Sequence, residues 1–207
     1  MERLENQRDQ IKKDIKERHD WENIAVIVGW DKVTMSSVET KANKGLEGLS
    51  LADAVMDFFL AESLAVGMIN FGLSADDVKT IMAHPAVSFI TDGLHGGSKP
   101  HPRLYGTHPR ILGRYVRKEK LLSLEEAVRK MTSLPAQKFG LAQKGLIATG
   151  YDADLVIFDP ETIIDTSTYE DPRSFPKGIE WVLANGQVVL EKGSPTGRTP
   201  GRVVRNR

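Results

Sequence analysis

Short apolar runs alternate with stretches of helical periodicity along the first 91 residues. Residues 51–64 and 75–83 carry apolar side chains at helical spacing, and each stretch follows a serine, a preferred N-cap residue. Three continuous apolar runs flank these stretches, as is typical of strands buried on both faces: 24–28, 66–71 and 87–91. This alternation predicts an α/β fold in which helices cover a parallel sheet.

The remaining segments up to residue 144 are less regular. Residues 2–20 are highly charged with one thin apolar stripe, which predicts a helix with one buried face. Residues 31–50 and 93–110 are predicted loops, the second because glycine, proline and histidine crowd it. Two further helices are expected at 111–118 and 123–132, the latter opened by a Ser-Leu-Glu-Glu capping box.

The pattern changes class after Gly145. Residues 154–158 read as a strand, and Asn185-Gly186 separates two apolar runs. Asn-Gly supplies the positive φ angles of a type I′ turn, so a β-hairpin is expected there. The predicted organisation is therefore an α/β part over 1–144, a small β unit over 145–193 and a basic tail over 194–207.

Composition narrows the function classes. The chain has 207 residues with 28 Lys and Arg against 28 Asp and Glu, so charge gives no reason to expect a nucleic acid or an anionic membrane as partner. There is no cysteine, which rules out disulfides and thiolate metal ligands. No apolar run is long enough for a membrane span, and the N-terminus is charged rather than signal-like. We expect a cytoplasmic protein.

Asp92 is the leading candidate for chemistry. It follows the predicted strand 87–91, and α/β folds place their ligands at the carboxyl ends of parallel strands. An aspartate there is equally typical of a turn or a helix cap. Arg103, further along, is suited to hold a substrate carboxylate by two hydrogen bonds. His95 and His101 lack the spacing of common zinc sites, so spacing alone favours solvated histidines.

Several motifs together are specific. Ser88-Phe-Ile-Thr-Asp-Gly93 is followed by His101-Pro-Arg-Leu-Tyr-Gly-Thr-His-Pro-Arg110, and later by Gly150-Tyr-Asp-Ala-Asp-Leu-Val-Ile-Phe-Asp-Pro160. This set resembles the N-acyl-D-amino-acid deacylase (D-aminoacylase) branch of the metal-dependent amidohydrolases. The likeness runs through nearly the whole chain and is strongest from about residue 84. The last motif alone is shared by many amidohydrolases, whereas the His-Pro-Arg segment discriminates better.

The resemblance implies a fold and a set of roles. The chain would form the C-terminal portion of a TIM barrel, its last three βα units, plus a small β unit of the accompanying sandwich. Asp92 matches the family's catalytic acid/base and would be a metal ligand or lie beside the metal. The resemblance makes Arg103 the expected contact of the substrate carboxylate. Tyr105 and Ser36 are further candidate substrate contacts, although a serine at position 36, after the first predicted strand, is more typical of a turn. The reaction implied is hydrolysis of the amide in an N-acyl-D-amino acid to a carboxylate and a D-amino acid.

The chain departs from the family in its metal ligands. The resemblance implies zinc, or another divalent metal, held by a His-x-His pair, a Cys or similar residue and two further histidines, and this chain has neither His-x-His nor Cys. We therefore expect a part of a larger enzyme, inactive by itself, that associates with a missing N-terminal half or forms a homo-oligomer. Two alternatives stay open: a hydantoinase- or dihydroorotase-like amidohydrolase, and a non-catalytic self-associating module.

Overall fold

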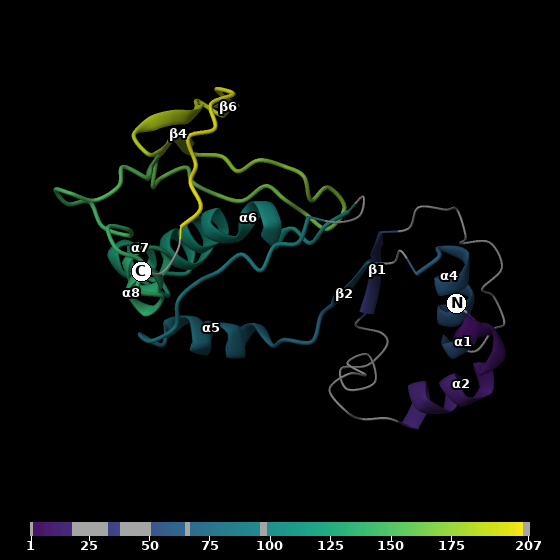
Figure 1. Cartoon of the computed structure of the whole chain (residues 1–207). Helices are drawn as coiled ribbons and strands as arrows, with labels where there is room; N and C mark the ends of the chain where they lie inside the picture. Colours follow the sequence, from purple (N-terminus) through teal and green to yellow (C-terminus); the bar gives the residue numbers. More distant parts are fainter. Residues whose placement is uncertain (1, 18–32, 38–50, 65–66, 96–98, 205–207) are drawn as a thin grey trace. The chain divides into compact units, whose positions relative to one another are not determined.

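The computed structural model describes residues 2–17, 33–37, 51–64, 67–95 and 99–204. They form two compact units, one made of residues 1–73 and 94–101 and the other of residues 74–93 and 102–207 (Figure 1). None of the helices in the described ranges combines the length and apolarity that crossing a membrane requires. The predicted strand at 24–28 lies outside the described residues.

The first unit contains the N-terminal helices. The predicted helix at 2–20 is split into α1 (Glu2–Asn6) and α2 (Arg8–Glu17), and the predicted helix at 51–64 is confirmed as α4 (Leu51–Ala61). Arg8 of α2 contacts Asp57 at 2.6 Å and Asp53 at 3.1 Å, and Lys12 contacts Asp53 at 2.6 Å. Ion pairs therefore join α2 to the polar face of α4, whose Val55, Met56 and Phe58 are buried.

The strands of the first unit correct one prediction and confirm another. Gly67–Asn70 is a strand, β2, as its apolar run predicted. Its partner is β1 (Val33–Ser37), which lies inside the predicted loop 31–50. The two strands pair antiparallel. Two short antiparallel segments suffice to form a ladder, so β2 pairs with β1 and not with the parallel neighbour that the order of the elements predicted.

Five helices belong to the second unit. They are α5 (Ala75–Ala83), α6 (Arg103–Arg110), the π-helix η2 (Ile111–Lys118), α7 (Leu124–Met131) and α8 (Ser133–Lys138). Two predicted caps are confirmed: the Ser74 and Ser123 hydroxyls accept the backbone N–H of Asp77 and Glu126, each at 3.2 Å. The predicted cap Ser50 lies outside the described residues. The predicted loop 93–110 is wrong over its second half, since α6 occupies 103–110.

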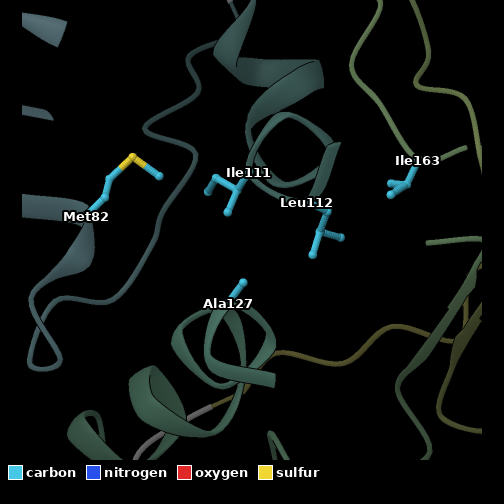
Figure 2. Close-up of a cluster of buried hydrophobic side chains, with 5 residues drawn as sticks. All are labelled: Met82, Ile111, Leu112, Ala127 and Ile163. Atoms are coloured by element: carbon cyan, nitrogen blue, oxygen red, sulfur yellow. The ribbon is translucent and has the colours of Figure 1, made fainter. Parts of the chain in front are cut away.

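The apolar core of the second unit brings together distant parts of the chain. Met82 of α5, Ile111 and Leu112 of η2, Ala127 of α7 and Ile163 are all buried. Figure 2 shows that these side chains, which come from four separate segments of the chain, point toward one region. The α5 helix and the segment after it are therefore packed on the same core as α6–η2, which orders the neighbourhood of residue 92.

A four-stranded antiparallel sheet completes the second unit. Its order is β3 (Leu155–Phe158), β4 (Ile179–Ala184), β5 (Gln187–Glu191) and β6 (Ser194–Pro195). The predicted hairpin is confirmed as β4–β5, and Asn185 and Gly186 have φ angles of 45° and 74°. Residues 194–195, predicted as part of a solvated tail, add the last strand.

The predicted strand at 87–91 does not form. Residues 87–95 have no regular secondary structure, so the parallel pairing expected of this run is absent from the described residues. An apolar run becomes a strand only beside another strand. Here the backbone N–H of Phe89 is donated instead to the carbonyl of Lys130 at 3.1 Å, which ties the run to helix α7.

Asp154 connects the four-stranded sheet to the segment that precedes it in the sequence. One carboxylate oxygen accepts the backbone N–H of Asn185 in the hairpin turn at 2.8 Å, and the other contacts Lys144, which also pairs with Asp152 at 2.9 Å. The Lys144 ammonium, and after it the Asn185 N–H, hold the pKa of Asp154 below its usual range. Asp154 therefore has a structural role in this chain.

Replacing Asp154 with Asn is expected to lower the Tm near neutral pH by about 2–4 °C, the equivalent of one lost charge-assisted contact. Because the pKa of Asp154 is depressed in the folded state, its contribution is present above the unfolded value of about 3.9 and is lost as pH falls through the folded value. The gap between the two proteins should therefore close below about pH 4 in thermal melts. An equal gap at pH 3 and pH 7 would contradict this.

Candidate active site

Asp92 and Arg103 meet in the second unit. The Oδ2 atom of Asp92 lies 2.8 Å from Nη2 of Arg103, and the two side chains are 64% and 40% exposed. Asp92 has a φ angle of 45°, a left-handed conformation that aspartate tolerates better than most residues. The structure thus brings together the two residues that the sequence singled out separately. Their exposure leaves both polar ends within reach of a small molecule.

Gly93 explains why this pair is close. A Cβ atom added to Gly93 would lie 2.5 Å from Cδ1 and 3.0 Å from Cα of Leu104, the residue after Arg103. The Leu104 side chain could move away from an added Cβ, but its backbone would still be closer than in nine of ten real Cβ contacts, so glycine favours this approach. The Asp-Gly sequence therefore presses the chain after the carboxylate against the first turn of α6, whose first residue is Arg103.

Helix α6 is itself fixed at several points. Gly106 packs so tightly that an added Cβ would come within 2.9 Å of Cβ of Asp165. Asp165 also pairs with Arg110 at 2.8 Å. Tyr105, a predicted substrate contact, is half-buried and meets the Phe175 ring edge-on with centroids 6.1 Å apart. Its ring is thus used in packing, while Arg103 faces Asp92.

The other predicted residues are placed less closely. Ser36 lies on β1 at a shift in register and belongs to the first unit, so its predicted substrate contact stays a prediction. His95 is exposed. His108, inside α6, is half-buried, and burial lowers its pKa, which favours the neutral imidazole. His84 stands at the C-cap position of α5, and its Nδ1 accepts the N–H of Ala86 at 3.2 Å.

Metal-ligand geometry is not found in the part of the chain that the structure describes. No three His, Asp or Glu side chains gather there as a metal site would require. Asp92 has a guanidinium beside it. The described residues therefore do not fit a complete metal centre.

An open groove lies elsewhere in the second unit. It has a volume of about 630 Å³ and is lined by η2 and by the segment 164–168, with Arg110, Arg114 and Asp165 among its residues. Asp92, Arg103 and Tyr105 do not line it. The candidate site is therefore a surface pair of polar groups on ordered supports rather than an enclosed pocket within the described residues.

Sequence reasoning missed the support of this pair. Residues 102–110 contain two prolines and a glycine, which argued for a loop. The available signal was Pro102, because proline is common at the start of a helix, where its missing N–H costs nothing. Pro102 stands at the N-cap position of α6, and its carbonyl accepts the N–H of Gly106 at 3.0 Å.

Comparison with known proteins decides the family. The model of the amidohydrolase family matches residues 17–190. The chain belongs to this amidohydrolase family. The chain is 46% identical over 139 residues to the N-acyl-D-glutamate deacylase of Alcaligenes xylosoxydans xylosoxydans, a match that covers 67% of the chain and 28% of that protein. The chain therefore spans less than a third of this relative's length, and the predicted resemblance is confirmed.

Solved structures of related amidohydrolases agree. The crystal structure of a D-aminoacylase superposes with a TM-score of 0.76 at 33% identity, covering 99% of this chain and 46% of that one. The N-acyl-D-glutamate deacylase from Bordetella bronchiseptica, solved with zinc and a phosphonate mimic of the tetrahedral intermediate, gives a TM-score of 0.70 at 37% identity and covers 84% and 37%. The α/β fold class predicted from the sequence is confirmed by these likenesses.

Proposed function

We propose that this amidohydrolase chain supplies two residues of an N-acyl-D-amino-acid deacylase: the aspartate that transfers the proton and the arginine that binds the substrate carboxylate. The observation behind the proposal is the 2.8 Å contact between Asp92 and Arg103. In this proposal Asp92 is the general base and the Arg103 guanidinium binds the substrate carboxylate. The two groups are neighbours, which suits an acyl amino acid, since its amide and its α-carboxylate are also neighbours. The deacylases that this chain resembles support the choice of substrate class.

The chemistry is hydrolysis of the acyl amide. Asp92 accepts a proton from the attacking water while the water oxygen bonds to the acyl carbon. It then returns this proton to the amide nitrogen as the C–N bond breaks. The products are a carboxylate and a free D-amino acid. Arg103 binds the α-carboxylate, and since a guanidinium carries five N–H donors, one side chain can contact Asp92 and substrate together.

We propose that other parts of the complete polypeptide supply the ligands of the enzyme's metal. Relatives are crystallised with zinc or have a binuclear metal centre. Because the described residues hold no ligand cluster, we assign Asp92 to proton transfer and not to a complete metal site of this chain. We also propose the finer fold assignment, with residues 1–144 in the last part of a barrel and residues 145–193, extended by the strand at 194–195, in the sandwich.

Replacing Arg103 with Met in the complete, metal-loaded enzyme should raise KM for an N-acetyl-D-amino acid about 10- to 100-fold, the value of a lost charge-assisted carboxylate contact. For the matching N-acetyl-D-amino-acid amide, which has no α-carboxylate, parent and variant should have similar KM values. Steady-state kinetics on both substrates measure the difference. A rise of the same size on both would contradict carboxylate binding by Arg103.

A matched control and a substrate panel complete this test. Arg110→Met removes a guanidinium from the other end of the same helix, where it pairs with Asp165, and should leave KM unchanged. Hydantoins and dihydroorotate probe the alternative amidohydrolase reading, and turnover of these cyclic amides in place of N-acyl-D-amino acids would overturn the proposed function. Light scattering on enzyme that turns over neither class tests the self-associating module.

A further inference from the structure

The segment that carries Asp92 lacks the sheet hydrogen bonds that would normally fix it. Residues 87–95 have no regular secondary structure, yet their neighbours are tightly held. Three cations of helices α7 and α8 donate to backbone carbonyls just upstream; we call them the cation clamp, and they are Arg129, Lys130 and Lys138.

Lys130 is the centre of the clamp. Its side chain is fully buried, and its ammonium donates to the carbonyl of Met82 at 2.6 Å and of His84 at 2.5 Å. The same ammonium lies 5.4 Å from the centroid of the Phe89 ring, and the Lys130 carbonyl accepts the Phe89 N–H at 3.1 Å. Lys130 thus contacts the chain on both sides of Pro85, from the end of α5 to Phe89, three residues before Asp92.

The other two cations of the clamp contact the next carbonyls along the chain. Arg129 donates to the carbonyl of Pro85 at 2.9 Å, and Lys138 donates to the carbonyl of Ala86. Helix α5 has no basic residue in its own last turn. Its C-terminal carbonyls, where the helix dipole favours positive charge, therefore take their cations from another helix.

Burying the Lys130 ammonium next to two other cations is unfavourable in itself. Burial lowers the pKa of Lys130, and the charges of Arg129 and Lys138 lower it further, whereas Glu126 opposes them. Fully buried lysines are rare unless their charge is satisfied by partners. Here the partners are carbonyls of the very segment that leads to Asp92.

We propose that the cation clamp positions Asp92 for proton transfer, with Lys130 as the principal positioning residue. The inference rests on the proposed function. From Met82 to Phe89 the clamp sets the path of the chain, and Gly93 sets it on the far side by its contact with Leu104. Asp92 is held between these two fixed points, facing Arg103. No strand is needed to hold the carboxylate, because side-chain donors replace the missing neighbour.

The test uses Lys130→Met in the complete, metal-loaded enzyme. Methionine keeps an unbranched stem and removes the ammonium. Turnover per folded, metal-loaded site should fall about 10- to 100-fold, since small displacements of a catalytic group cost that much. KM should change less than about twofold, because Arg103 binds substrate from a differently supported helix. Lys118→Met, the same change at an exposed lysine of η2, should alter neither.

A second readout separates positioning from general damage. In the Asp92→Asn background, Lys130→Met should cause no further loss of residual turnover, because Lys130 acts through Asp92. A defect independent of Asp92 would multiply with it and overturn the inference. If Lys130→Met does not fold, Lys138→Met at the exposed end of the clamp decides: a lower kcat at constant KM supports the clamp, and an unchanged kcat overturns it.

The outcomes also distinguish the two proposals. If Asp92→Asn retains parental turnover, the proposed function fails whatever the clamp variants do. If Asp92→Asn is inactive while Lys130→Met and Lys138→Met keep the parental kcat, the proposed function stands and the clamp inference alone fails.

Discussion

Asp92→Asn in the complete enzyme is expected to remove nearly all turnover of N-acyl-D-amino acids while the bound metal stays close to the parental amount. Asparagine has the same shape and tolerates the left-handed φ of 45° found here, so the backbone should be preserved. Its amide cannot accept and return a proton. General acid–base catalysis is worth about 10²- to 10⁴-fold, which sets the size of the expected loss in kcat.

The measurement pairs initial rates with metal analysis of the same preparation. Asp76→Asn, the same substitution on the exposed first turn of α5, serves as the control and should keep parental kcat. Substantial turnover by Asp92→Asn enzyme prepared free of parent protein would remove Asp92 from the reaction. Loss of metal together with activity would instead indicate a ligand role.

Gly178→Ala should be the most destabilising of the single-methyl additions considered. Gly178 has a φ of +82°, and an added Cβ would lie 2.5 Å from the backbone N and 2.6 Å from Cα of Ile163. The left-handed conformation costs alanine about 1–2 kcal/mol, and forcing two backbone segments apart adds about 1–3 kcal/mol. Because Ile163 is part of the core, the strain cannot be relieved at the surface.

Comparison of Gly178→Ala with Gly193→Ala isolates the packing component. Gly193 has nearly the same φ, +79°, but nothing lies within 4 Å of an added Cβ. Urea unfolding of both variants should therefore show a loss of about 1–2 kcal/mol for Gly193→Ala and clearly more for Gly178→Ala. Equal losses would mean that the contact between residues 163 and 178 relaxes without cost.

Features encoded over a few neighbouring residues were predictable. The caps at Ser74 and Ser123 and the Asn185-Gly186 turn depend on chemistry within three residues, and each is found as expected. The strand at 87–91 was not predictable in this way, because a strand exists only through its partner. What the apolar run meets is the carbonyl of Lys130, some forty residues later in the sequence.

The candidate site was predictable as a set of residues but not as an arrangement. Asp92 and Arg103 were both expected to matter, and their predicted roles stay predictions until tested. Their contact depends on the close approach of Gly93 to Leu104, which no local pattern reports. Lys130 was overlooked, although it follows the buried Ala127 by three residues on α7, a spacing that places it on the same helix face.

The role of Asp154 bears on how function is transferred between relatives. Its carboxylate is used up in joining Lys144 to the hairpin turn at Asn185. In this chain the Gly-x-x-Ala-Asp stretch therefore closes a β-turn, and a genome search based on this stretch is expected to group proteins by scaffold and not by substrate. Sorting such sequences by chemistry calls for the neighbourhood of residues 92 and 103 instead.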